Sequence, residues 1–167
     1  KGIPTSSYPQ RLAPLFNASY GIAVAGTHGK TTTSAWIAYV LLELGYDPSA
    51  LIGSRVKQFS TNVLVGSSPY FVLEADEYQR KLDMYDPDIA IITSIEYDHP
   101  DFFKNSEAYC DVFQKFSQRV LQSGTLIACW DGGGVSEALH VFKSPNLITY
   151  GLSNSFDYYA HNIRIGD

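Results

Sequence analysis

The sequence lacks the features that would direct a protein into or across a membrane. Its 167 residues contain no apolar run that approaches the roughly 18 residues of a spanning helix, and no secretory leader opens the chain. It has only two cysteines, Cys110 and Cys129, and neither belongs to a CxxC pair. Isolated thiols in a chain of this size are typical of a reducing compartment. We therefore expect a cytoplasmic protein without a membrane partner.

Basic charge is also scarce. The chain carries 12 Lys and Arg against 17 Asp and Glu, which gives a formal net charge of −5. A protein that binds nucleic acid regardless of sequence needs a basic face, so we expect no nucleic-acid partner. A nucleotide is still compatible with this charge, because a phosphate loop binds through backbone N–H groups and one lysine. With 45% hydrophobic and 17% charged residues, the chain is expected to form a globular domain with a core.

Short apolar stretches alternate with amphipathic ones along the chain. This alternation predicts an α/β fold in which a mostly parallel sheet is flanked by helices. Strands are expected at 21–25, 70–73, 88–93, 125–129 and 147–150, with a β extension near the C-terminus within 156–165. Helices are expected at 9–16, 30–44 and 135–142, and a further one starts at Asn105 or Ser106 and stops before Gly124.

The helix expected at 30–44 has a regular apolar pattern. Ile37, Val40, Leu41 and Leu44 recur at i, i+3, i+4 and i+7, which predicts that these four side chains form its buried face. Gly45 follows at the place of a C-terminal glycine cap.

Chemically active side chains follow three of the expected strands, in segments 26–31, 74–77 and 96–101. Ligands of parallel α/β sheets bind beyond the carboxyl ends of the strands, at a topological switch point. We therefore expect the three segments to meet in one site.

The segment GIAVAGTHGKTTTSAW predicts a phosphate loop. Gly26 and Gly29 let backbone N–H groups curl toward an anion, and the following helix adds partial positive charge at its N-terminus. Lys30 would reach the β- and γ-phosphates, and the Thr31 hydroxyl would bind Mg²⁺. The strict G-x-x-x-x-G-K-[ST] pattern requires glycine at the place of Val24. The alternative is a glycine-containing turn with an incidental lysine.

The stretch FVLEADEY places Glu74, Asp76 and Glu77 at the end of a strand. A nucleotide loop needs a carboxylate on a neighbouring strand to complete the magnesium shell. Glu74 leaves the strand first and is the best candidate. Asp76 and Glu77 fit a solvated acidic turn equally well.

The stretch SIEYDHPDFF places His99 between Asp98 and Asp101. A histidine near acids can bind a metal ion with a carboxylate behind it. A lone histidine in a loop is more often no ligand, and the spacing alone favours that second interpretation. His140 and His161 do not lie between two acidic residues as His99 does, and we interpret both as surface residues.

Four motifs in sequence, AVAGTHGKTTT, EADE, SIEYDHPD and LITYG, resemble the central ATP-binding domain of the peptidoglycan Mur ligases over residues 12–165. These are ATP-dependent amide-bond ligases with a P-loop NTPase-like central domain, and their superfamily includes folylpolyglutamate synthase. The family loop G-T-x-G-K-T matches Gly26 to Thr31, so the resemblance accounts for Val24. His28 makes the loop similar to that of members that join L-alanine to UDP-N-acetylmuramate, and of murein peptide ligases, which reuse tripeptide.

The resemblance implies a reaction and a role for each motif. A substrate carboxylate attacks the γ-phosphate of ATP to give an acyl phosphate, and an amine then displaces phosphate. Lys30 would bind the β- and γ-phosphates, while Thr31 and Glu74 would hold one Mg²⁺. His99 would hold a second Mg²⁺ that bridges the γ-phosphate and the carboxylate. The residues implied to bind the nucleotide are Gly26, Thr27, His28, Gly29, Lys30, Thr31 and Thr32.

Two departures from the family pattern are visible. Several relatives have a carbamylated lysine on the helix after the D-H motif, where DVFQKFSQ places Gln114 beside Lys115. The alignment favours Gln114, so we predict no carbamate. Members also carry an N-terminal domain for the UDP-sugar and a C-terminal domain for the amino acid. We therefore expect residues 1–20 to lead in from a missing domain, and 21–167 to be an ATP-binding domain that is incomplete at its end and inactive alone.

Two other classes of protein share a phosphate loop. A GTPase would need an N-K-x-D-like motif, and a small-molecule kinase an arginine-rich lid, and neither pattern occurs here. A non-catalytic nucleotide-binding module is the third alternative, against which the retained lysine, threonine and acidic residues argue.

Overall fold

A computed structural model describes residues 4–140, 142 and 146–165. In this part of the chain, eight strands form one sheet in the order β3-β2-β4-β1-β5-β6-β7-β8. Every neighbouring pair is parallel except β2 with β3, so the expected mostly parallel sheet is confirmed. The strands are β1 (Tyr20–Ala25), β2 (Ser49–Val56), β3 (Thr61–Leu64), β4 (Tyr70–Glu74), β5 (Ile89–Ile92), β6 (Thr125–Cys129), β7 (Leu147–Gly151) and β8 (Tyr158–Tyr159).

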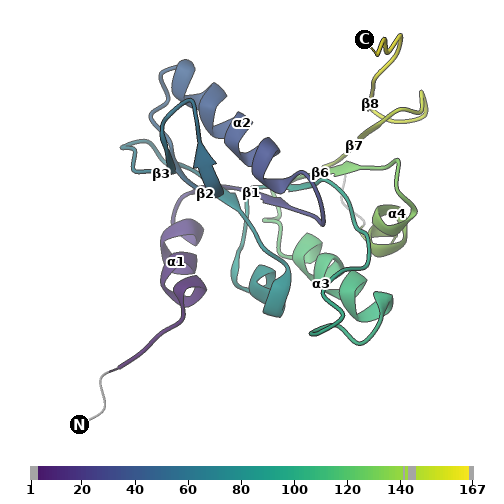
Figure 1. The fold of residues 1–167 in the computed structure, drawn as a ribbon, viewed down its shortest axis with the longest axis horizontal. Helices are drawn as coiled ribbons and strands as arrows, with labels where there is room; N and C mark the ends of the chain where they lie inside the picture. Colours follow the sequence, from purple (N-terminus) through teal and green to yellow (C-terminus); the bar gives the residue numbers. More distant parts are fainter. Residues whose placement is uncertain (1–3, 141, 143–145, 166–167) are drawn as a thin grey trace.

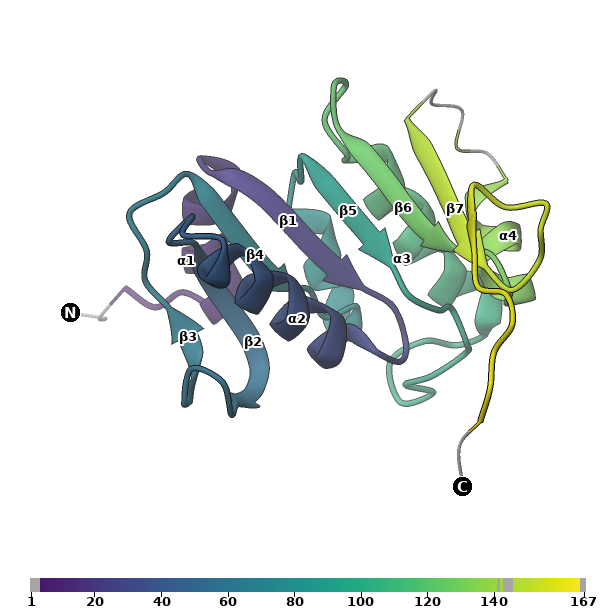
Figure 2. The same ribbon diagram turned by 90° about the horizontal axis from the view of Figure 1, so that it is seen from above.

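Helices cover both faces of the sheet. One helix, α2, lies on one face, and the others lie on the opposite face (Figures 1 and 2). The helices are α1 (Tyr8–Asn17), α2 (Lys30–Glu43), the 3-10 helix η1 (Tyr78–Met84), α3 (Ser106–Gln118) and α4 (Gly133–Leu139).

The sheet separates two hydrophobic cores because successive side chains of a strand point to opposite faces. In β1, Ala23 and Ala25 face the core under α1, α3 and α4, whereas Ile22 and Val24 face α2. The small side chains of β1 leave room for the aromatic residues of the larger core. Its largest fully buried side chains include Phe16, Tyr109, Phe113 and Phe116.

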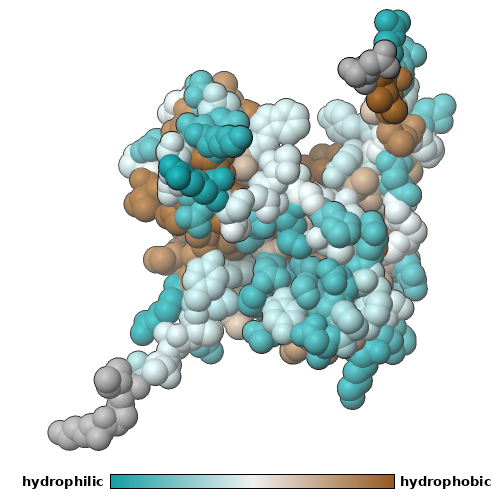
Figure 3. All heavy atoms as spheres, viewed as in Figure 1, coloured by the Kyte–Doolittle hydropathy of each residue, from teal (hydrophilic) through white to brown (hydrophobic). Residues whose placement is uncertain are grey.

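The strands β2 and β3 and the 3-10 helix η1 are elements that the sequence analysis missed. In β2, Ala50, Ile52 and Val56 are buried, but Gly53, Ser54 and Arg55 interrupt the apolar pattern. The short edge strand β3 turns back on β2 in antiparallel pairing and buries none of its four residues. Hydrophobic atoms gather at this end of the molecule, while the surface over α3 is largely hydrophilic (Figure 3).

The prediction of which side chains form the buried face of α2 is partly wrong. Ile37 and Leu41 pack against the core, but Val40 and Leu44 are 43% and 67% exposed. The fully buried residues are Ser34 and Ala38. The helix meets the sheet through small side chains, which let its backbone approach the strands and rotate the contact stripe away from Val40 and Leu44.

Other boundaries differ by a few residues. The β extension is limited to β8, and α4 begins two residues earlier than expected. The first residues of the lead-in (1–3), position 141 of the helix expected at 135–142, and the domain end at 166–167 lie outside the described residues. Among the helices of the described part, none is long and apolar enough to cross a membrane.

Candidate functional site

Three neighbouring parallel strands deliver the site. Because β4, β1 and β5 are adjacent and run in the same direction, the segments after them leave one edge of the sheet. The backbone N–H of Thr27 donates to the carbonyl of Ser94 at 3.0 Å, which joins the loop after β1 to the segment after β5. The Lys30 ammonium donates to Glu77, which joins the same loop to the segment after β4. The expected meeting of the three segments is therefore observed.

Two glycines allow the loop between β1 and α2 to form. Gly26 has a φ of 132°, and a Cβ there would lie 2.8 Å from the carbonyl oxygen of Ser94. Gly29 adopts the left-handed conformation, with a φ of 83°, immediately before α2 begins at Lys30. The first N–H groups of a helix lack partners within it and favour an anion. The loop thus has the backbone of a phosphate cradle.

The Lys30 ammonium lies inside this loop. It donates to the carbonyl oxygens of Gly26 and Thr27, the latter at 3.2 Å, and forms an ion pair with Glu77 at 3.0 Å. All three partners are oxygen acceptors that surround the ammonium. A lysine held there is a point charge that can bind phosphate oxygens at the mouth of the loop.

Thr31 and Glu74 lie in contact, as the expected metal pair should. The Thr31 hydroxyl donates to Glu74 Oε1 at 2.8 Å, and the backbone N–H of Gly53 donates to Glu74 Oε2 at 2.6 Å. The sequence analysis missed Gly53, although a glycine inside a strand signals a close approach. A Cβ at that position would lie 2.6 Å from Glu74 Oε1. The oxygens of Thr31 and Glu74 are the donor type that Mg²⁺ prefers, so the pair fits that ion.

His99 has a strained backbone and faces the same site. Its φ is 55°, in the left-handed region that a histidine seldom adopts. Its Nε2 atom lies 3.7 Å from Glu77 Oε1 and 3.9 Å from Asp98 Oδ2, and its ring packs beside that of Tyr78. Asp101 accepts a 2.8 Å hydrogen bond from the Tyr78 hydroxyl.

Glu77 is buried, so the interpretation of this residue as part of a solvated turn is wrong. Its side chain is 1% exposed and accepts from Lys30 and from the Tyr109 hydroxyl, the latter at 3.1 Å. The Tyr109 hydroxyl also lies 2.8 Å from the Thr27 hydroxyl. Burial above all, and the charge of Glu77, raise the pKa of Tyr109, so the phenol keeps its proton. One feature of the sequence could have indicated this contact. Tyr109 lies on a helix face that otherwise carries apolar residues, and a buried hydroxyl needs a hydrogen-bond partner.

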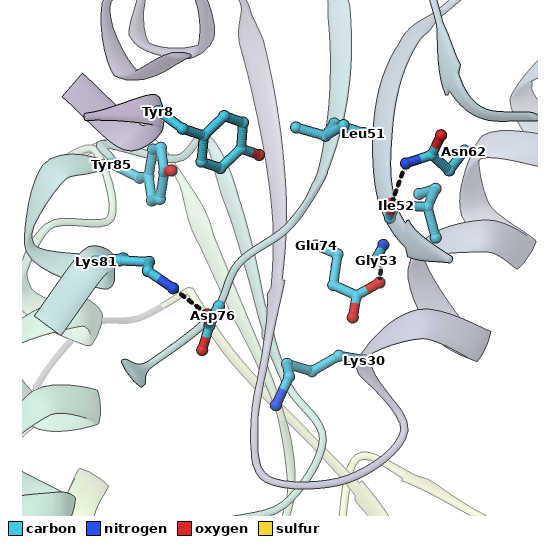
Figure 4. A pocket seen from close by; sticks show the side chains of 10 residues that line it. All are labelled: Tyr8, Lys30, Leu51, Ile52, Gly53, Asn62, Glu74, Asp76, Lys81 and Tyr85. Carbon is cyan, nitrogen blue, oxygen red and sulfur yellow. Dashed lines mark hydrogen bonds and ion pairs between the residues drawn. The ribbon is translucent and has the colours of Figure 1, made fainter. Parts of the chain in front are cut away.

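A cavity of about 400 Å³ opens beside the loop (Figure 4). Asp76 forms an ion pair with Lys81 at its wall and its side chain stays 45% exposed, so the interpretation of Asp76 as part of a solvated acidic turn is compatible with the structure. Burial, with smaller effects of Tyr8 and Asp76, raises the pKa of Tyr85 to about 12. The cavity is lined by Tyr8, Lys30, Leu51, Ile52, Gly53, Asn62, Glu74, Asp76, Lys81 and Tyr85.

Two residues of the expected nucleotide set lie at the margin of the site. The backbone of His28 donates to Ser94 Oγ at 3.0 Å, but its imidazole is exposed and lies 3.8 Å from the carboxylate of Glu96. Thr32 is exposed on the first turn of α2. His140 and His161 are exposed, as expected of surface residues.

The sequence analysis compared Gln114 and Lys115 with a carbamylated lysine of the family that the motifs resemble. Gln114 lines a groove between α3 and α4, and Lys115 pairs with Asp111 at 2.8 Å on the surface of α3. The α3 residue that bonds to the phosphate loop is Tyr109.

Among the described residues, no three or more His, Cys, Asp and Glu side chains are grouped as a ready-made metal site. The candidate ligands are instead a threonine–carboxylate pair and a separate histidine. Such sparse protein ligation is typical of Mg²⁺, which keeps waters and takes oxygens from substrate phosphates.

Most of the chain matches the sequence pattern of a known protein family. The family described as the Mur ligase middle domain matches residues 24–166. UDP-N-acetylmuramate–L-alanine ligase of Desulfitobacterium hafniense (strain Y51) is 41% identical over 165 residues, which are 99% of this chain and 36% of that protein. The ligase of the same name from Thermosynechococcus vestitus is 42% identical over 98% of this chain and 34% of its own length. The chain thus spans about a third of the length of these curated relatives.

Solved structures with the same fold include two kinds of ligase. A murein peptide ligase from Psychrobacter arcticus has a TM-score of 0.76 and 27% identity, over 95% of this chain and 38% of that one. A UDP-N-acetylmuramate-alanine ligase from Thermotoga maritima has a TM-score of 0.71 and 26% identity, over 88% of this chain and 32% of that one.

Proposed function

Because the chain belongs to the Mur ligase family and covers its middle domain, we propose that it is the ATP-binding part of a ligase that joins L-alanine to UDP-N-acetylmuramate. The Thr31–Glu74 contact beside Lys30 carries the proposal, since a hydroxyl, a carboxylate and an ammonium meet at one phosphate loop. Relatives that bear this activity in their names are about 40% identical across nearly the whole chain.

In the proposed site, the backbone of 26–31 and the Lys30 ammonium bind and orient the phosphates of ATP. Thr31 and Glu74 would hold one Mg²⁺ and His99 a second, and such ions would neutralise phosphate charge during transfer. The oxygen donors of Thr31 and Glu74 fit this ion directly. The assignment of His99 is supported by its place at the site and by the family resemblance.

The proposed reaction transfers a phosphoryl group and then an acyl group. The carboxylate of UDP-N-acetylmuramate attacks the γ-phosphorus, which gives an acyl phosphate and ADP. The amine of L-alanine attacks the acyl carbon, forms the amide and releases phosphate. The residues of this chain contribute position and positive charge, which supply most of the catalysis in phosphoryl transfer.

A murein peptide ligase is the second candidate. Solved structures with that description match the chain with TM-scores of 0.77 and 0.76, slightly above the alanine-adding ligase. Such an enzyme uses the same carboxylate and ATP but takes a peptide amine in place of L-alanine.

We further propose a cytoplasmic location, with residues 21–167 as the ATP-binding domain and 1–20 as the lead-in from a preceding domain. Within that lead-in, α1 is anchored to the domain through Phe16, which is fully buried and packs edge-on against Phe71 and Tyr85.

The test uses the full-length protein that contains this chain. It is incubated with Mg·ATP and UDP-N-acetylmuramate, with L-alanine or tripeptide as the amine, and phosphate and amide product are followed by mass spectrometry. We expect phosphate release that requires both the acid and the amine, with L-alanine the preferred one. Preference for the tripeptide would favour the second candidate. Release without acid or amine, or a stable phosphorylated product, would contradict a ligase.

A further inference from the structure

A buried polar network connects α3 to the phosphate loop. Tyr109 donates its hydroxyl to Glu77 at 3.1 Å and lies 2.8 Å from the hydroxyl of Thr27. Tyr109 and Glu77 are 0% and 1% exposed. The proposed reaction assigns no role to either side chain, although both touch the loop that binds the phosphates.

Glu77 contacts two side chains to which the proposed reaction gives a role, Lys30 and His99. Its Oε2 accepts from the Lys30 ammonium at 3.0 Å, and its Oε1 lies 3.7 Å from His99 Nε2. A buried carboxylate has no bulk water to replace a lost partner, so its position depends on the few groups that donate to it. A displacement of Glu77 would therefore displace the ammonium and alter the surroundings of the imidazole.

The segment after Glu77 is tied to the same helix as Tyr109. Arg80 donates from both terminal nitrogens to Asp111 of α3 at 3.1 Å, and from Nε to Asp83 at 2.9 Å. Gln79 and Arg80 both have left-handed backbones, with φ of 55° and 58°. Such strain persists where surrounding contacts over-determine the chain, and it gathers at functional sites. Two anchors on α3, at 109 and 111, thus fix the segment that carries Glu77.

We propose that Tyr109 and Glu77 are positioning residues: the Tyr109 hydroxyl holds the Glu77 carboxylate, which sets the place of Lys30 and His99 for phosphoryl transfer. This inference rests on the proposed function for its reaction. The alternative is that Tyr109 only fills the core, with a hydroxyl satisfied by whatever acceptor is near.

A double-mutant cycle in the full-length protein separates these explanations. Tyr109→Phe removes the hydroxyl and keeps the ring, and Glu77→Gln removes the charge and keeps the shape. We expect Tyr109→Phe to lower kcat about tenfold, with the KM for L-alanine nearly unchanged, because one hydrogen bond to a charged group is lost. In the Glu77→Gln background, the same change should lower kcat by less than about twofold, because Tyr109 acts through Glu77.

The controls distinguish positioning from a general loss of stability. Tyr70 begins β4, at the opposite end of the strand from the site, and Tyr70→Phe should leave kcat unchanged. Thermal unfolding of every variant shows which fraction is folded. If Glu77→Gln does not fold, Glu77→Asp replaces it, and Tyr109→Phe should again have little further effect in that background.

The outcomes also separate this inference from the proposed function. If the parent protein ligates and the two substitutions act additively on kcat, or Tyr109→Phe has no effect on kcat, positioning is refuted. If the parent binds Mg·ATP but does not ligate, the proposed function fails. The same cycle is then measured on ATP affinity by calorimetry, where coupled losses support the network and additive losses refute it.

Discussion

At the residue scale, the Lys30 side chain lies inside the phosphate loop and donates to its carbonyl oxygens. Lys30→Ala removes a charge-assisted contact to the phosphates, and we expect a loss of about 1.5–3 kcal/mol in nucleotide binding free energy. Calorimetric titration of the full-length protein with Mg·ATP measures it. Lys57 lies exposed between β2 and β3, and Lys57→Ala is the matched control. Equal affinity of the Lys30 variant and the parent would refute the assignment.

Lys30→Ala also leaves a buried carboxylate without its cation. Glu77 is 1% exposed, and among the described residues only the Tyr109 hydroxyl still donates a hydrogen bond to it once the ammonium is gone. Removing one partner of a buried ion pair typically costs about 3–5 kcal/mol of stability. Denaturant unfolding of the variant is therefore needed beside the binding data, so that a weaker affinity is not confused with a smaller folded fraction.

Glu74 is the residue that should control the magnesium requirement. Glu74→Gln keeps the size of the side chain but removes the charge that a divalent cation prefers. We expect the Mg²⁺ concentration for half-maximal phosphate release to rise at least about tenfold. Glu43→Gln, at the exposed end of α2, removes the same charge away from the site and should leave that concentration unchanged. An unaltered Mg²⁺ titration for Glu74→Gln would remove this residue from the proposed metal site.

At the scale of secondary-structure elements, α3 contacts the site from the face of the sheet opposite α2. Asn105 caps this helix, and its side chain accepts from the backbone N–H of Ala108 at 2.9 Å. Asn105→Ala leaves that donor unpaired, so we expect the free energy of unfolding to fall by about 0.5–2 kcal/mol. Denaturant titration measures the change. Asn105→Ser retains a capping oxygen and should recover most of the loss, and a variant series in which serine is no better than alanine would argue against capping.

The parallel arrangement of β4, β1 and β5 explains why the site is assembled from segments distant in sequence. Each strand delivers one segment to the same edge, and β2 adds the backbone N–H of Gly53 that fixes Glu74. The neighbouring strand therefore acts as part of the site even though its side chains carry no proposed chemistry.

At the scale of the whole molecule, we expect the 167-residue chain by itself to fold and not to ligate. The phosphate loop and its acidic partners lie within it, but it spans about a third of the length of its relatives. Orientation of acid and amine contributes roughly 7–11 kcal/mol to such reactions, and that orientation would come from flanking domains. Turnover of the isolated chain should therefore stay near background.

Circular dichroism and thermal unfolding would report whether the isolated chain folds. Incubation with Mg·ATP, UDP-N-acetylmuramate and L-alanine, followed by mass spectrometry, would report ligation, with the full-length protein as the positive control. Amide formation at a rate comparable to that control would show that the flanking domains matter far less than the family resemblance implies.

The sequence by itself determined the features that neighbouring residues encode together. The alternation of apolar and amphipathic stretches predicted most strands and helices, and the loop from Gly26 to Thr31 was readable because its glycines, lysine and threonine are consecutive. The contact between Thr31 and Glu74 was also foreseeable, since carboxyl ends of neighbouring parallel strands share an edge.

Only the tertiary structure decided which side chains become buried partners. Thr27, Glu77 and Tyr109 are far apart in sequence, and no local pattern specifies that a strand end and a helix face will bring them within hydrogen-bonding distance. The rotation of α2 onto Ser34 and Ala38 depends likewise on how close its backbone can approach the sheet. Periodicity indicates that a helix has an apolar side, but the packing of the opposing surface selects the stripe that is covered.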